Sequence, residues 1–294
     1  MRSTTLFAFL GLAQPALAQQ RTPSLVERTG MLRSPPIAES SGVAVSRRHA
    51  GVLWTHNDSG DGPMLYATNL AGDDLGRYLV PGAANYDWED IALATCPALP
   101  RDCLYIADTG DNNQRRRNVT LYVVPEPAVL PQPAANDEPA RATARARAVR
   151  VRYPDGAHDV EAMWVEPDGS IQLVTKGTYG PMLRYLVPRA ALNRDTATAE
   201  PLERLPLVPQ RALGRLVTAA AISPNGERLV IRTYTELFFF RREKDRRLTN
   251  DGPSCWLSTL QPQGEGVAFL DDSTLVLTSE GVMGQAGPIH RVRC

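Results

Sequence analysis

A short segment with β-strand character occurs five times along this chain of 294 residues. Each copy places a small, polar or acidic residue before an apolar run, and the copies are SSGVAVS (40–46), WEDIALA (88–94), VEAMWVE (160–166), VTAAAIS (217–223) and GEGVAFL (264–270). Alignment of the apolar runs makes five positions equivalent: Ser41, Glu89, Glu161, Thr218 and Glu265. A recurring segment of this kind predicts an architecture in which one structural unit is repeated.

Further β-like runs follow each copy. A turn and a second run come next, as in VLWTH (52–56) and CLYIA (103–107), and a third run follows. Asn, Asp and Gly between the runs favour tight turns. A fourth run completes the first four copies, whereas the chain ends before the fifth copy has one. The segment SLVERTGMLRS (24–34) precedes the first copy and is predicted to supply the missing strand.

Four-stranded units that borrow one terminal strand describe a closed β-propeller, which leaves few sheet edges exposed. The predicted fold class is therefore all-β, with five four-stranded blades closed by an N-terminal outer strand in a single domain (19–294). The interval of 72 residues between Glu89 and Glu161 contains a Pro- and Ala-rich stretch (126–148), which we interpret as an inserted loop. A six-bladed propeller is the alternative if this interval holds a degenerate unit.

The N-terminus has the pattern of a secretory signal peptide (1–18). Arg2 is followed by a largely apolar stretch, and Ala16-Leu17-Ala18 fits a cleavage signal that would be cut near Gln19. No other stretch is long and apolar enough to span a membrane. We expect a secreted or periplasmic protein.

Export would place the four cysteines in an oxidising compartment, where disulfides persist. Cys96 and Cys103 flank a turn-like segment, so a local bridge is favoured, which would leave Cys255 to pair with Cys294. Four cysteines allow three pairings, and the sequence alone does not decide among them.

Carboxylates concentrate at equivalent positions of the repeat. In a propeller the innermost strands line a central channel, so Glu89, Glu161 and Glu265 are expected to share one ring. Further acidic residues flank this ring: Glu39, Asp87, Asp90 and Asp159. Like charges at close range are unfavourable unless a cation or hydrogen bonds compensate. Calcium takes six to eight oxygen ligands, so calcium is the predicted cofactor.

A second ring is expected where the second strands end. It aligns Asp58 of NDSGD (57–61), Asp108 of DTGD (108–111), Lys176, Arg232 or Thr233, and Glu280. Asp58 and Asp108 join the three glutamates as predicted metal ligands. The alternative is structural, because aspartate in such turns often accepts hydrogen bonds from nearby backbone N–H groups.

The segments WTHNDSGDG, YDWEDIA, LYIADTGDNNQRR, LYVVPEP, DVEAMWV, LVTKG and GEGVAF resemble a group of exported bacterial β-propeller proteins without a settled activity. The resemblance covers most of residues 38–294. More distantly, the chain is similar to phytase-like esterase and gluconolactonase-like propellers. That similarity implies a divalent metal, usually calcium, at the channel mouth. The chain departs from these relatives in its apparent blade number, five instead of six, and it lacks a clear copy of their metal-ligand sets.

Two functions compete at this stage. The first is a metal-dependent hydrolase that acts on an ester, lactone or phosphate ester. His56 or His158 would serve as general base, and Lys176, Arg232 and the three arginines at 115–117 would bind an anionic small-molecule substrate. No G-x-S-x-G segment suggests a serine nucleophile. Glycosidases also use a pair of carboxylates, so a glycosidase is a further alternative.

The second function is a non-catalytic propeller that binds a ligand or another protein. The formal net charge is zero, which gives no general attraction to nucleic acid or to a membrane surface. We expect a monomer that binds a small molecule and no nucleic acid. An open channel mouth with converging polar groups would favour the enzyme over the binding protein.

Overall fold

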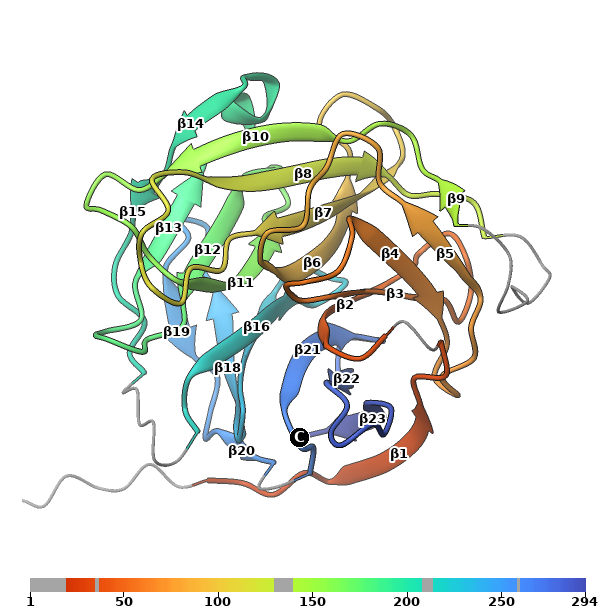
Figure 1. The fold of residues 1–294 in the computed structure, drawn as a ribbon. Helices are drawn as coiled ribbons and strands as arrows, with labels where there is room; N and C mark the ends of the chain where they lie inside the picture. Colours follow the sequence, from red (N-terminus) through yellow and green to blue (C-terminus); the bar gives the residue numbers. More distant parts are fainter. Residues whose placement is uncertain (1–19, 35–36, 130–139, 208–213, 258–259) are drawn as a thin grey trace, which may run out of the picture.

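The structure, a computed structural model, describes residues 20–34, 37–129, 140–207, 214–257 and 260–294. The described residues form mainly antiparallel sheets arranged around a central axis, with one 3-10 helix and no α-helix (Figure 1). There are five such sheets, so the predicted five-bladed β-propeller is confirmed. The described part of the chain contains no sixth sheet.

Each blade begins at the axis with one of the repeated segments. Blade 1 contains β2 (Ser40–Val45), β3 (Leu53–Asn57), β4 (Met64–Thr68) and β5 (Gly76–Leu79). Blade 2 contains β6 (Trp88–Thr95), β7 (Asp102–Asp108), β8 (Val119–Pro125) and β10 (Arg147–Arg152). Blade 3 contains β11 (Val160–Val165), β12 (Ile171–Thr175), β13 (Arg184–Val187) and β15 (Glu200–Pro201).

The last two blades complete the circle. Blade 4 contains β16 (Val217–Ile222), β17 (Arg228–Thr233) and β18 (Glu236–Arg242), and its outer edge is divided between β19 (Leu248–Asn250) and β20 (Cys255–Trp256). Blade 5 contains β21 (Gly264–Phe269), β22 (Thr274–Ser279) and β23 (Pro288–Arg293). Its outer strand is β1 (Leu25–Met31), which pairs antiparallel with β23, as the sequence predicts.

Two short strands extend the outer edges of blades 1 and 2. The first, β9 (Arg141–Ala142), pairs in parallel with β5, and the second, β14 (Thr196–Thr198), pairs in parallel with β10. The 3-10 helix η1 (Arg189–Asn193) precedes β14. The long interval in blade 2 therefore supplies β9 and the outer strand β10, while residues 130–139 lie outside the described part.

A separate hydrophobic cluster fills each of the five interfaces between neighbouring blades. The clusters are built around Tyr105 and Leu173, Trp54 and Trp88, Phe239 and Leu275, Trp164 and Ile231, and Leu53 and Val276. Burial of these apolar faces is the main force that holds the blades together, because apolar burial contributes about 25 cal/mol per Å². The clusters fix the inner strands around the axis.

Both favoured disulfides are present, Cys96–Cys103 and Cys255–Cys294. Two disulfides are typical of proteins that fold in an oxidising, extracytoplasmic compartment. The predicted signal peptide (1–18) lies outside the described residues. Within the described residues, no helix has the length and apolar character needed to cross a membrane.

Candidate functional site

The five equivalent positions of the repeat are β-bulges. In β6, Trp88 pairs with Asp108 and Asp90 pairs with Ala107, which leaves Glu89 without a cross-strand partner. The register shifts at the matching place in the other four inner strands, at Ser41, Glu161, Thr218 and Glu265. A bulge changes the direction of a side chain and often lies beside a functional site.

The bulged residues divide into two kinds. The Ser41 hydroxyl donates a hydrogen bond to the backbone carbonyl of Glu89 at 2.8 Å, and the Thr218 hydroxyl donates to that of Glu265 at 3.1 Å. These hydroxyls therefore fasten one inner strand to the next. The three glutamates are almost completely buried. Their carboxylates form the centre of what we call the acidic mouth.

Eight carboxylates make up the acidic mouth, each linked to its neighbours by hydrogen bonds or electrostatic repulsion. They are Glu39, Asp58, Asp87, Glu89, Asp159, Glu161, Glu265 and Glu280. Two subsets have ligand oxygens within 4.8 Å of one another: Asp58, Asp87 and Glu89, and Glu89, Asp159 and Glu161. Glu89 belongs to both subsets. The donors are all oxygens, which hard cations such as calcium prefer.

Glu89 is repelled by several of its neighbours in this group. It is only 4 % accessible to solvent, and no hydrogen bond to its carboxylate is found among the described residues. Burial, followed by repulsion from Glu161 and Asp58, raises its pKa well above the ordinary value. Gly110 packs directly against it, because a Cβ atom at this glycine would lie 2.0 Å from Glu89 Oε1. An anion so enclosed requires either a proton or a cation.

The Asp58 and Asp87 side chains are hydrogen-bonded to each other. Burial raises both pKa values, and the proximity of Asp58 helps to raise that of Asp87 to about 7. Two carboxyl groups at hydrogen-bond distance share a proton, since both cannot ionise cheaply at that range. A divalent cation would replace this proton.

Lys176 is the cation of the acidic mouth. Its Nζ lies 2.7 Å from Glu161 Oε1, at the end of the second strand of blade 3. Burial alone would lower its pKa, but the charges of Glu161 and Glu89 outweigh burial, and the net pKa is raised. Lys176 therefore stays charged. Burial also raises the pKa of Tyr234, so its phenol stays protonated beside Glu265.

Blade 5 contributes two further carboxyl groups. Burial, followed by repulsion from Glu280, raises the pKa of Glu265 to about 8. Burial, followed by repulsion from Glu39, raises the pKa of Glu280 to about 7. Gln263 Nε2 donates hydrogen bonds to both carboxylates, at 3.3 Å and 2.5 Å respectively. These groups change protonation close to neutral pH.

The two Asp-x-Gly-Asp turns have different roles. The Asp58 side chain joins the acidic mouth, whereas the nearby Asp61 accepts hydrogen bonds from its own turn. Asp108 is fully buried, pairs with Arg116 at 2.9 Å and accepts a hydrogen bond from the backbone N–H of Asp87. It is not part of either set of clustered ligand oxygens among the described residues.

Neither predicted histidine belongs to the two sets of clustered ligand oxygens among the described residues. His56 is fully buried against Trp88, and its Nδ1 lies 3.0 Å from the carbonyl oxygen of Asn57. Burial lowers its pKa to about 4, so it is neutral at pH 7. His158 Nε2 lies 3.1 Å from Asp155, and its ring packs against the rings of Tyr153 and Tyr185.

Arg232 joins two blades. Its guanidinium is fully buried and donates to the backbone carbonyls of Gly266 and Thr278, the latter at 2.9 Å, and to the side chain of Gln261. Because of these contacts, the hydrogen-bond donors of the Arg232 guanidinium are directed at blade 5.

The sequence places Asp87 and Asp159 beside the ring of glutamates, but it does not predict them as metal ligands. Their signal is an Asp-x-Glu pattern that places each two residues before a bulged glutamate.

No protein-family model matches this chain, and no curated protein matches it. The chain is distantly similar to solved structures of other β-propellers. The PQQ-bound aldose sugar dehydrogenase from Streptomyces coelicolor is 14 % identical, with a TM-score of 0.49, over 92 % of this chain and 99 % of that one. The periplasmic gluconolactonase of Pseudomonas aeruginosa is 13 % identical, with a TM-score of 0.41, over 81 % and 64 %.

The hydrazine synthase of Kuenenia stuttgartiensis is similarly related, at 12 % identity and a TM-score of 0.40, over 83 % of this chain and 56 % of that one. The three proteins have different names and comparable degrees of similarity. Likeness at this level describes the fold and carries no argument about the reaction.

Proposed function

We propose that this protein is a divalent-metal-dependent hydrolase that acts on an ester, lactone or phosphate ester at the acidic mouth. The observation that carries the proposal is the enclosed Glu89 carboxylate, which accepts no hydrogen bond from the described residues and has further carboxylates on both sides. Calcium is the ion that best fits this set of oxygen donors.

The charge balance supports a cation at this position. The acidic mouth holds eight carboxylates and Lys176, and the two buried or half-buried arginines nearby, Arg116 and Arg232, are held by partners at its margins. Asp58, Asp87 and Glu89 would hold the metal. Such an ion, when bound, polarises a carbonyl or phosphoryl oxygen and lowers the pKa of a bound water.

The remaining groups of the acidic mouth have separate roles in this proposal. Lys176 would bind an anionic oxygen of the substrate, since it stays charged and is partly accessible. Tyr234 would donate a hydrogen bond from its protonated phenol. Glu280, whose pKa of about 7 suits proton transfer at neutral pH, replaces the histidines as the proposed general base.

The test combines metal binding with turnover. Purified protein is assayed against ester, lactone and phosphate-ester panels after treatment with chelator and again after addition of calcium. We expect activity that calcium restores and that Glu89→Gln abolishes, because the amide removes one charged ligand while it preserves the shape of the side chain. The matched control is Glu200→Gln, an exposed glutamate on the outer strand β15, which should behave like the parent protein.

Two outcomes would contradict the proposal. Turnover that survives both chelator and Glu89→Gln would exclude metal-dependent catalysis at the acidic mouth. Calcium binding that raises the melting temperature, with no turnover on any panel, would instead identify a non-catalytic binding propeller.

A further inference from the structure

The central channel has a second compartment. A cavity of about 730 Å³ is lined by the later residues of the inner strands, among them Val45, Leu93 and Ile222, and by the turns that follow. The bulges that form the acidic mouth occur at the beginnings of the same five strands. The cavity and the acidic mouth therefore lie at opposite ends of the channel.

Asp90 stands between the two compartments. Its carboxylate accepts hydrogen bonds from the backbone N–H groups of Ile91 at 2.8 Å, Met163 at 2.8 Å and Ala220 at 3.2 Å. One side chain thus joins inner strands from blades 2, 3 and 4 across the axis. A molecule in the cavity is separated from the acidic mouth by this junction.

Apolar side chains form slightly more than half of the cavity wall, and several of them are incompletely covered. Ala92, Leu93 and Ala94 in β6 and Ala221 and Ile222 in β16 are all partly accessible to solvent. The short alanine side chains leave space that larger residues would fill. Cavities of about 300–1,000 Å³ with apolar walls are the usual enclosures for small organic ligands.

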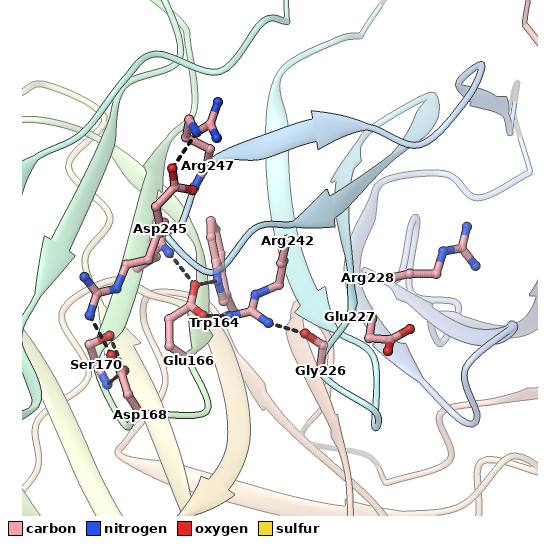
Figure 2. Close-up of polar contacts among 12 residues, drawn as sticks. Trp164, Glu166, Asp168, Ser170, Gly226, Glu227, Arg228, Arg242, Asp245 and Arg247 are labelled. Carbon is pink, nitrogen blue, oxygen red and sulfur yellow. Dashed lines mark hydrogen bonds and ion pairs between the residues drawn. The ribbon is translucent and has the colours of Figure 1, made fainter.

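Three charged side chains line the cavity among the described residues, and two are neutralised by partners. Arg47 forms an ion pair with Asp102. Glu166 is buried and accepts hydrogen bonds from Trp164, Gln172 and Arg242, and Arg242 also donates to the carbonyl of Gly226 (Figure 2). Both charges are therefore already satisfied within the protein.

Arg189 is the third, and its charge is not neutralised. Its Nη2 donates to the carbonyl oxygen of Pro97 at 2.9 Å, and no carboxylate pairs with it among the described residues. Its stem packs on Gly169, where a Cβ atom would lie 2.9 Å from Arg189 Cδ. The cavity thus combines apolar walls with one positive charge at its rim.

We propose that this cavity binds a monoanionic amphiphile, with the apolar body between the inner strands and the anionic group at Arg189. The walls provide apolar burial, and the single uncompensated guanidinium selects one negative charge. This site is independent of the acidic mouth and of any reaction there.

The probe for this site is 1-anilinonaphthalene-8-sulfonate, an aromatic monoanion whose fluorescence increases in apolar surroundings. We expect saturable binding of one dye per protein. Thr95→Trp and Ala221→Phe, which fill the cavity from two blades, should each weaken binding at least tenfold. Thermal unfolding of both variants establishes that they remain folded. Two substituted positions are used so that the test still stands if one variant does not fold.

A neutral dye with a similar ring system, N-phenyl-1-naphthylamine, separates the charge from the apolar walls. Arg189→Gln should weaken sulfonate binding about tenfold and leave the neutral dye unaffected. Arg48→Gln, an exposed arginine that does not line the cavity, is the matched control and should change neither. Glu89→Gln should also leave both dyes unaffected, which separates this proposal from the proposed hydrolase.

Binding that persists in both filled variants would overturn the proposal, because the dye would then occupy another surface. Equal effects of Arg189→Gln and Arg48→Gln would overturn the assignment of the anionic group.

Discussion

Replacement of Glu265 by glutamine should make the metal-free protein more stable at neutral and alkaline pH. The pKa of Glu265 is raised from its ordinary 4.5 to about 8 in the folded protein, mainly by burial and then by repulsion from Glu280. A carboxyl group with a raised pKa favours folding fully at pH values below 4.5. This contribution is lost as pH rises through about 8, because the unfolded chain ionises more easily.

The size of the effect follows from the pKa difference. Between pH 4.5 and pH 7 the loss amounts to at most 2.5 pKa units, or about 3.5 kcal/mol at about 1.4 kcal/mol per unit. For a domain of this size, each kcal/mol changes the melting temperature by about 2–4 °C. Glu265→Gln removes the ionisation, so its melting temperature should exceed that of the parent by up to about 7–14 °C at pH 7.

Thermal unfolding followed by circular dichroism, in chelator, from pH 4.5 to 8.5 is a suitable assay. The parent should lose stability steadily over this range, and Glu265→Gln should lose less. Glu200→Gln, an exposed glutamate on β15, should follow the parent at every pH. Parallel pH curves for the parent and Glu265→Gln would refute the reasoning, since Glu265 would then ionise without cost in the folded state.

Three further predictions concern other parts of the fold. Gly110→Ala should weaken calcium-dependent thermal stabilisation, since its Cβ would collide with Glu89, whereas Gly62→Ala, whose Cβ would meet its nearest neighbour at 3.7 Å, should not. Asp90→Asn should lower the free energy of unfolding in urea by about 2–3 kcal/mol, because an amide N–H₂ would face backbone N–H donors, and an unchanged value would contradict a junction role. Serine at both members of the Cys255–Cys294 bridge should cost about 4 kcal/mol in the same assay, because the bridge closes a loop with a sequence separation of 39 residues.

The overall architecture was predictable because the same pattern of strands and turns recurs in the sequence once for each blade. The segment 24–34 was recognisable as the closing strand only because the fifth copy lacked one, and β1 does pair with β23. Neither the parallel strand β9 nor the division of blade 4's edge between β19 and β20 was predicted. These strands are only two or three residues long, so they leave little periodic pattern in the sequence.

The candidate site was predictable only in part. The equivalence of Glu89, Glu161 and Glu265 could be recognised from the sequence. A bulge, however, depends on which residues pair across two strands, and this register cannot be predicted from the sequence. Asp58 and Asp108 carry nearly the same local motif. Their roles differ because Arg116 pairs with Asp108, a contact made by a loop whose conformation no local pattern predicts.

The five bulges also bear on how this fold can change its chemistry. A bulged residue has no partner on the adjacent strand, so its side chain is freed from the cross-strand packing that restricts its neighbours. Here the five positions hold Ser41, Glu89, Glu161, Thr218 and Glu265. The Ser41 and Thr218 hydroxyls fasten neighbouring inner strands, whereas the three glutamates can be exchanged one blade at a time while the strand ladders stay the same. The protein thus has three adjustable positions around one axis, which natural variants or a designer can combine to select ions and substrates.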